Sequence, residues 1–225
     1  MKYIKTIAAI TLACTSLISC NDELKEEQYD KYLSFANSGV VDVYLKYESE
    51  GGHRNYKIPV LLSGSLLHDK DTRVDIEVAN DTIADLNFDR YRYREDLFFR
   101  ELDKKHYDFP SMSTVIKKGE ATSLIDVNFN LADLDMIDKY ILPLKISQTS
   151  DYPANPRKWY KRSLMNLILF NDYSGLYSVG GEIAEQDENG NNTGSLIKVE
   201  TRNSWVVDEN TIFFYAGFAE EEAID

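Results

Sequence analysis

Residues 125–129 read IDVNF, and this alternation of apolar and polar side chains decides the fold class. Successive side chains of a β-strand point to opposite faces, so Ile125, Val127 and Phe129 would share one buried face. The same period of two, rich in β-branched and aromatic residues, recurs in residues 41–47, 74–78 and 142–146. This repetition predicts half-buried antiparallel strands.

Two further stretches, residues 56–62 and 164–170, are more continuously apolar, as the central strands of a sandwich are. Turn-forming residues separate the strands, for example the Ser-Gly-Ser of residues 63–65 and the two prolines within residues 151–156. We therefore predict an all-β protein whose residues 32–150 form an Ig-like Greek-key β-sandwich.

Three segments do not follow the strand pattern of the sandwich. Residues 83–105 are compatible with a short helix or with an irregular crossover. Residues 131–138 are compatible with one helical turn. Residues 151–172 are predicted to be a linker and a connecting strand that lead out of the sandwich.

A second β region is predicted over residues 173–225. After a turn comes one strand, and the polar residues 187–194 then read as a long hairpin loop. Three short strands would follow, over residues 196–199, 204–207 and 211–216. Trp205 is expected in their core. Such a short antiparallel β-meander leaves an exposed edge, so we predict the start of a second, truncated β domain. The alternative is that these strands extend the sheets of the sandwich.

Four motifs occur in the order found in one family of lipoproteins. They are YKIPVLLSG at residues 56–64, YDFP at 107–110, IKKGE at 116–120 and YILPLKI at 140–146. In this order they resemble the Ig-like N-terminal domain of unknown function of Bacteroidetes lipoproteins from polysaccharide-utilisation loci. Phe109 stands where that family has leucine. The resemblance covers roughly residues 28–150.

The stretch that begins at Tyr173 resembles the start of the C-terminal domain that often follows in these lipoproteins, with an opening like that of calycin-type barrels. Together the two resemblances imply a surface lipoprotein associated with glycan capture. This implication rests on the loci in which the family occurs and not on the chemistry of particular residues, because a fold alone does not determine a function.

The first twenty residues read as an export signal. Lys2 and Lys5 precede an apolar stretch, residues 7–18, that is too short to span a bilayer as a helix. The stretch leads to Leu-Ile-Ser-Cys, ending at Cys20, which resembles the bacterial lipobox. We therefore predict a signal peptide over residues 1–19 and a lipid anchor on Cys20. The alternative is an ordinary secretory signal that contains a cysteine.

The predicted anchor determines what the mature chain carries. Cys14 would leave with the signal, so no free thiol, disulfide or cysteine nucleophile would remain. Residues 20–31 are acidic and are predicted to form a flexible tether. Acidic residues after a lipidated cysteine resemble the surface-export signal of Bacteroidetes lipoproteins. We expect an outer-membrane protein that is exposed at the cell surface and attached to the membrane through its lipid alone. The alternative is that it faces the periplasm from the inner leaflet of that membrane.

The charge of the chain excludes some partners. Its 225 residues include 25 Lys and Arg against 38 Asp and Glu, a formal net charge of −13. Loss of Lys2 and Lys5 with the signal takes this charge from −13 to −15. Nucleic acid and anionic lipid headgroups both require clustered positive charge, so we expect no nucleic-acid partner.

We expect no catalytic residue, no metal and no cofactor. His53, His68 and His106 are far apart in sequence and are expected to be isolated surface residues, and no G-x-S-x-G motif is present. A glycosidase needs two carboxylates at a set separation, but among 38 acidic residues some pair always meets that distance. Asp187 opens a loop that departs from the EF-hand calcium pattern, with Asn192 where glycine is required, and a looser calcium site built from clustered surface carboxylates is the alternative.

Aromatic side chains are the remaining candidates for a binding site. Tyr152, Trp159 and Tyr160 lie in a proline-containing loop, together with Arg157 and Lys158. The C–H faces of sugars stack on flat aromatic rings, so exposed rings here would bind a polysaccharide or oligosaccharide. The alternative is that Trp159 packs on an edge of the sandwich and anchors the linker.

Two other features mark surface chemistry. The sequence Asp81-Thr82-Ile83 resembles the short O-glycosylation motif of exported Bacteroidetes proteins, which makes Thr82 a candidate acceptor. The arginines at positions 90, 92 and 94 form a basic cluster. This cluster would either contact an acidic ligand or neutralise nearby carboxylates.

The sequence therefore favours a non-catalytic, surface-anchored lipoprotein that binds glycan as an accessory of polysaccharide uptake, beside outer-membrane uptake proteins. A structural or adhesion module that binds a protein partner is the alternative. A glycoside hydrolase is the third hypothesis, and it has the least support from the residues.

Overall fold

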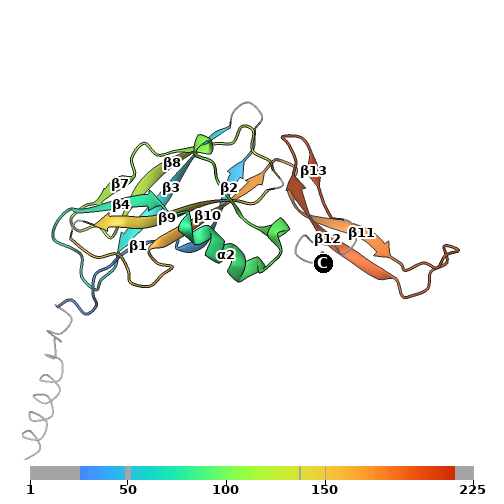
Figure 1. The fold of residues 1–225 in the computed structure, drawn as a ribbon, viewed down its shortest axis with the longest axis horizontal. Helices are drawn as coiled ribbons and strands as arrows, with labels where there is room; N and C mark the ends of the chain where they lie inside the picture. The colour runs from blue at the N-terminus through green and yellow to red at the C-terminus, as the bar shows by residue number, and fades with distance from the viewer. Residues whose placement is uncertain (1–25, 49–51, 137, 150, 216–225) are drawn as a thin grey trace, which may run out of the picture.

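The computed structural model describes residues 26–48, 52–136, 138–149 and 151–215. Two β-sheets, here sheet A and sheet B, pack face to face, and a third sheet projects from one end of this sandwich (Figure 1). The predicted all-β class is confirmed.

Sheet A is antiparallel throughout. Its strands, in spatial order, are β1 (Leu33–Phe35), β3 (His53–Leu62), β8 (Thr122–Asn130) and β6 (Tyr107–Asp108). β3 carries the first motif of the family resemblance, and β8 carries the alternating stretch at residues 125–129.

Sheet B is mixed. Its strands, in spatial order, are β2 (Gly39–Lys46), β10 (Arg162–Phe170), β9 (Tyr140–Thr149), β4 (Thr72–Val78) and β7 (Ser113–Ile116), and β5 (Arg100–Glu101) also pairs with β9. β10 pairs with β2 in parallel, and β5 with β9 in parallel. The chain crosses from sheet A to sheet B between β1 and β2, where Gly39 adopts a φ of +74° that other residues rarely adopt.

The core of the sandwich lies between the two sheets and confirms the predicted alternation. Ile125, Val127 and Phe129 are buried on the inner face of β8, and the polar residues between them are partly exposed. Further fully buried side chains come from both sheets: Leu33, Phe35, Ile116, Leu142, Leu144 and Met165. Two sheets with one apolar face each therefore close a common core.

A helical segment covers part of the outer face of sheet B. It comprises α2 (Asp81–Tyr91) and η2 (Glu95–Leu97), whereas η3 (Lys104–His106), further along the chain, packs against β6 and β8 of sheet A. Ile83, Leu86 and Tyr91 of α2 pack in one cluster with Ile141 of β9 and Leu164 of β10. Of the two options for residues 83–105, the short helix is confirmed up to Tyr91, and the remaining residues form an irregular connection with 3-10 turns and the short strand β5 (Arg100–Glu101). The one helical turn expected in residues 131–138 is wrong, because the described residues there form turns and Asp133 takes a φ of +60°.

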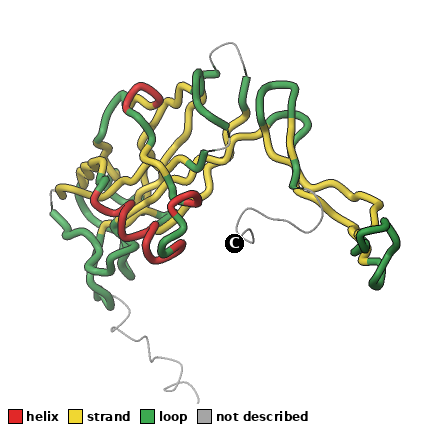
Figure 2. The backbone as a smooth tube through the Cα atoms, turned by 45° about the vertical axis from the view of Figure 1, so that its right-hand side comes forward, coloured by secondary structure: helices red, strands yellow, loops and turns green. Residues whose placement is uncertain are grey.

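The third sheet is an antiparallel meander of β11 (Gly175–Ile183), β12 (Ile197–Val206) and β13 (Ile212–Phe213). The meander is as predicted, except that residues 197–206 form one continuous strand where two short ones were expected. Both views show this sheet extending away from the sandwich (Figures 1 and 2).

The start of the described chain is held by the sandwich. Within the predicted tether, residues 20–31, the Glu27 carboxylate accepts hydrogen bonds from the backbone N–H and the hydroxyl of Ser65, and the flexibility of this segment stays a prediction. The same carboxylate pairs with Lys31 at 2.9 Å. The hydrogen bonds from Ser65 and Lys31 lower the pKa of Glu27 to about 2.

Candidate functional site

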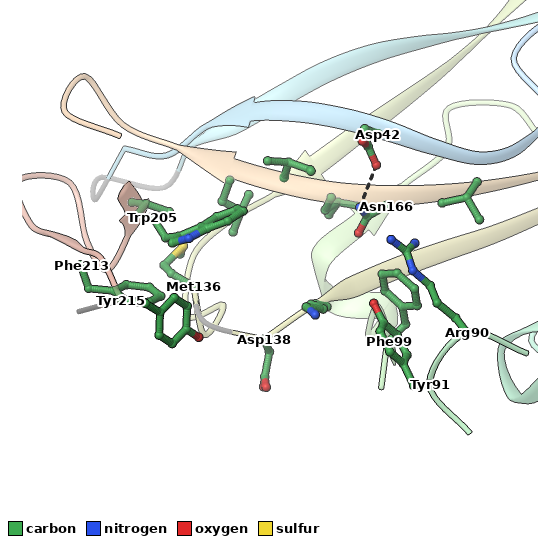
Figure 3. A pocket seen from close by; sticks show the side chains of 16 residues that line it. Asp42, Arg90, Tyr91, Phe99, Met136, Asp138, Asn166, Trp205, Phe213 and Tyr215 are labelled. Carbon is green, nitrogen blue, oxygen red and sulfur yellow. Dashed lines mark hydrogen bonds between the residues drawn. The ribbon is translucent and has the colours of Figure 1, made fainter. Parts of the chain in front are cut away.

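A pocket of about 470 Å³ lies where the outer face of sheet B meets the third sheet (Figure 3). Its floor is the outer face of β2 and β10, beyond the part that α2 covers. Its walls come from the end of α2, from the loop before β9, and from β12 and β13. Ligand sites of proteins typically have volumes of about 300–1,000 Å³, so this junction pocket has room for a small ligand.

The floor carries a polar pair. Asp42 of β2 lies opposite Asn166 of β10 in the parallel register, and the Asn166 Nδ2 donates to the Asp42 Oδ1 at 2.8 Å. A carboxylate only accepts, so this bond fixes the Asn166 amide with its Oδ1 as an acceptor. The second carboxylate oxygen of Asp42 and the amide oxygen of Asn166 are two neighbouring acceptors, which match a ligand with hydroxyl groups.

The wall from the third sheet is aromatic. Trp205 of β12 is 43% exposed and lies opposite Phe213 of β13. The Phe213 and Tyr215 rings meet edge to face, with centroids 5.6 Å apart. Figure 3 shows Trp205, Met136, Phe213 and Tyr215 gathered at one end of the pocket.

The opposite wall combines rings with positive charge. The Tyr91 and Phe99 rings lie 5.7 Å apart, and the Arg90 guanidinium lies 5.6 Å from the centroid of each. The Lys139 Nζ lies 5.1 Å from the Tyr91 ring. Buried Asn87 exchanges two hydrogen bonds with the backbone of Phe99, at 2.8 and 2.9 Å, and so fixes this wall to α2. The Asp42–Asn166 pair lies between the two walls (Figure 3).

One buried side chain fixes the third sheet to the end of β10. The Asn171 Nδ2 donates to the carbonyls of Asp208 and Thr211, at 2.7 and 3.2 Å, in the turn between β12 and β13. Its Oδ1 accepts from the backbone N–H groups of Tyr173 and Ser174, at 2.9 and 2.8 Å. Asn171 therefore sets where the aromatic wall stands relative to the floor.

The aromatic residues proposed from the sequence lie elsewhere. Trp159, 38% exposed, and Tyr160 lie on the surface turn of residues 157–161, each with a neighbouring cation over its ring: Lys158 at 5.1 Å and Arg157 at 5.7 Å. Tyr152 is half-buried and lines a separate groove with His68 and Pro153. The three rings thus belong to two different surfaces, and glycan stacking on them stays a prediction.

The prediction for Trp205 is wrong: its ring is exposed in the junction pocket and does not lie in a core. The cause is the third sheet, whose described residues have no second sheet packed over them to bury that ring. Sequence reasoning also missed the Asp42–Asn166 pair. The available signal was Asn166 itself, a lone amide inside the apolar run of residues 164–169.

Thr82 lies in the first turn of α2 and is 2% exposed. Its hydroxyl accepts a hydrogen bond from Arg162 of β10. Because the folded chain covers this hydroxyl, the predicted O-glycosylation requires modification before α2 packs against sheet B.

The three histidines are not brought together. His68 and His106 are buried, contrary to the expected surface positions, and each ring donates to a backbone carbonyl: that of Ile116 at 3.3 Å and that of Asn130 at 3.0 Å. Across the part of the chain that the structure describes, no three metal-ligating side chains gather into a site.

The loop at residues 187–194 is a hairpin turn. The Asp187 carboxylate accepts from the backbone N–H groups of Asn189 and Asn191, at 2.9 and 2.8 Å, and these bonds lower its pKa. Gly190 takes a φ of +82° within this turn. The carboxylate is therefore used to hold the turn itself.

The arginine cluster does not act as a unit. Arg90 lines the junction pocket, whereas Arg94 pairs with Asp96 at 2.8 Å. Cys20 and the rest of the predicted signal lie outside the described residues. Within the described ranges, no helix has the length and apolar character needed to cross a bilayer.

Comparison with family models gives two matches. A model described as a domain of unknown function, DUF4973, matches residues 24–150. A second model, described as a C-terminal domain, matches residues 161–225. No curated protein matches the chain.

Solved structures of similar proteins come from Bacteroides. A protein of unknown function from Bacteroides ovatus is 32% identical, with a TM-score of 0.67 over 86% of this chain and 64% of its own. A multidomain protein including DUF1735, also from Bacteroides ovatus, is 32% identical, with a TM-score of 0.66 over 85% and 63%. An auxiliary nutrient binding protein from Bacteroides thetaiotaomicron is 29% identical, with a TM-score of 0.65 over 83% and 63%. The chain therefore spans less than two thirds of the length of each of these relatives.

Proposed function

We propose a function from one premise: the chain belongs to the family of the domain of unknown function DUF4973. In this proposal it is a non-catalytic lipoprotein, anchored to the outer membrane through Cys20 and exposed at the cell surface. There it binds glycan as an accessory of polysaccharide uptake, beside outer-membrane uptake proteins. The junction pocket is its binding site.

The observation that carries the proposal is the exposed Trp205 ring in a pocket whose floor is the Asp42–Asn166 pair. A sugar ring has apolar C–H faces and a rim of hydroxyl groups. The faces stack on an indole, and the hydroxyls donate to carboxylate and amide oxygens. Both requirements are met within one cavity of about 470 Å³.

The relatives support a binding role. The protein from Bacteroides thetaiotaomicron, 29% identical, is named an auxiliary nutrient binding protein. That name fits a protein that captures a nutrient without transforming it. We extend this role to the present chain and assign it to the junction pocket.

The test is affinity electrophoresis of the chain through gels that contain single polysaccharides. A retained polysaccharide is then used to compare Trp205→Ala with Trp159→Ala, a matched control of similar exposure. We expect Trp205→Ala to weaken retention about tenfold or more, equal to about 1.4 kcal/mol, because a stacked aromatic is a typical hot spot. We expect Trp159→Ala to leave retention unchanged.

Two outcomes would contradict this assignment. Loss of retention in Trp159→Ala alone would move the site to the surface turn that the sequence indicates. Hydrolysis of a retained polysaccharide, abolished by Asp42→Asn, would show a glycoside hydrolase and overturn the non-catalytic part of the proposal.

The alternative function is binding of a protein partner, and the third sheet is the observation that favours it. Leu176, Ile197 and Phe214 are all more than half exposed. Exposed apolar patches mark interaction surfaces. A pull-down that recovers one specific protein, and that Leu176→Asp abolishes while retention in polysaccharide gels persists, would support this alternative.

A further inference from the structure

The first described residues are fastened to the turn between β3 and β4. The Glu27 carboxylate accepts from Ser65, the Gln28 backbone N–H donates to the Ser65 hydroxyl at 2.6 Å, and the Lys31 Nζ donates to the Leu66 carbonyl at 2.6 Å. This set of contacts, here called the Glu27 clamp, ties residues 27–31 to one end of the sandwich.

Gly64 makes the clamp fit. A Cβ at this position would lie 2.9 Å from the Lys31 Cγ and 3.2 Å from the Glu27 Oε1, and Gly64 has a φ of +147°. Only a residue without a side chain allows this close approach. The clamp is therefore a built contact between two segments almost forty residues apart in sequence.

Exposed apolar side chains lie on the two segments that the clamp joins. Tyr29 is 73% exposed and Leu67 is 65% exposed, and Leu66 is exposed next to it. Tyrosine and leucine side chains are favoured at the boundary between lipid headgroups and acyl chains. We call these three residues the Leu67 patch.

Six residues separate Cys20 from Glu27. Fully extended, the seven steps from Cys20 to Glu27 span at most about 25 Å, and a flexible chain of that length has a mean end-to-end distance of about 15 Å. A lipid on Cys20 therefore keeps the clamped end of the sandwich close to the membrane.

We propose that the Leu67 patch is a membrane-contact surface, which the Glu27 clamp holds against the lipid headgroups of the membrane that carries the anchor. This inference rests on the lipid anchor proposed above. It also sets an orientation, because both views place the clamped end and the third sheet at opposite ends of the molecule (Figures 1 and 2). The junction pocket then faces away from the membrane.

The test uses the full lipidated chain on phosphatidylcholine vesicles that carry a spin label on the headgroup. Leu67→Cys provides a thiol for a fluorophore, since the Cys20 sulfur is held in the thioether of the proposed lipid and Cys14 leaves with the signal. Leu196→Cys, at the far end of the third sheet, is the matched control and is also exposed. We expect the label at position 67 to lose most of its fluorescence and the label at position 196 to lose none.

A second pair of variants tests the clamp. Glu27→Ala in the Leu67→Cys chain removes the clamp carboxylate, whereas Glu26→Ala removes a neighbouring carboxylate outside the clamp. We expect quenching at position 67 to fall in Glu27→Ala and to stay unchanged in Glu26→Ala. Equal quenching in the two variants would overturn the role of the clamp.

Four results would overturn the contact surface. Vesicle-bound chain with no quenching at position 67, or with equal quenching at positions 67 and 196, removes the oriented contact while the anchor stands. Failure of the chain to float with vesicles would show that the lipid anchor is absent. Glycan binding is tested independently of the anchor, by retention in polysaccharide gels. A dimer of the unlipidated chain that Leu67→Asp dissociates would assign the patch to a second copy of the chain.

Discussion

The sandwich and the third sheet are built from the same kind of strand but differ in what covers them. In the sandwich, alternating apolar side chains from two sheets meet and close a core. In the third sheet, every residue of β11 except the last is exposed, and the buried side chains of β12 are Val199, Ser204 and Val206. The difference teaches that alternation determines which residues share a face, while the presence of a second layer determines whether that face is a core or stays exposed.

The largest expected effect comes from the closed core. Phe129→Ala removes a fully buried ring from the inner face of β8 and leaves a cavity between the sheets. We expect the free energy of unfolding to fall by about 3–5 kcal/mol. Denaturant unfolding followed by circular dichroism measures this change.

The matched change in the third sheet is Leu176→Ala on β11, where the side chain is mostly exposed. We expect a change within about 0.5 kcal/mol, because no buried contact is lost. If the two variants lowered the free energy of unfolding by similar amounts, the contrast between the two regions would be wrong, and the third sheet would have a covered face in solution.

The next effect concerns the side chain that joins the two regions. Asn171→Ala removes four hydrogen bonds, two to the carbonyls of Asp208 and Thr211 and two from the backbone N–H groups of Tyr173 and Ser174, while the Thr211 carbonyl keeps its bonds from the N–H groups of Val207 and Asp208. We expect a local cost of about 1–3 kcal/mol, which loosens the third sheet and leaves the sandwich intact. Hydrogen exchange measured by mass spectrometry would show faster exchange in β12 and β13 alone.

Asn203→Ala is the control for this experiment, since Asn203 is an exposed residue of the same sheet. Its exchange pattern is expected to match that of the unchanged chain. If Asn171→Ala accelerated exchange in β8 as well, the two regions would form one cooperative unit.

The smallest effect is expected at the opposite end of the sandwich, where the Glu27 clamp holds the first described residues through hydrogen bonds and an ion pair. The pKa of Glu27 is about 2 in the folded chain, against 4.5 for an unperturbed glutamate. A lowered pKa stabilises the clamp fully above about pH 4.5, and this contribution is lost as the pH falls through about 2. We expect the protection factors of the residue 27–31 amides, which are the exchange rates corrected for the intrinsic pH dependence, to fall across that window.

Glu27→Gln is expected to remove this pH dependence, because the amide does not titrate, and Glu26→Gln is expected to retain it. Persistence of the acid response in Glu27→Gln would assign it to another carboxyl group.

Much of the fold could be predicted from the sequence, because period-two alternation is a local signal. The face shared by Ile125, Val127 and Phe129 follows directly from their spacing. The sequence could not distinguish helix α2 from an irregular crossover, because the apolar residues of α2 do not all lie on its buried face. Ile83 and Leu86 pack on sheet B, whereas Phe88 is exposed.

The site was harder to predict because it depends on pairing between distant segments. Asp42 and Asn166 are 124 residues apart, and only the parallel register of β2 and β10 makes them neighbours. Trp205 could not be distinguished from a core residue, because an aromatic residue fits a strand pattern whether or not a second layer covers its face in the folded chain. Trp159 was the more visible candidate only because loops with prolines indicate exposure.

The parallel pairing of β2 with β10 has a consequence for the order of events during folding. Because β2 is near the start of the sandwich and β10 is its last strand, the floor of the junction pocket is among the contacts with the longest loops to close. Closing such long loops costs chain entropy, and this cost slows folding. A chain interrupted before β10 would lack the Asp42–Asn166 pair, so the polar part of the pocket floor depends on the two ends of the sandwich coming together.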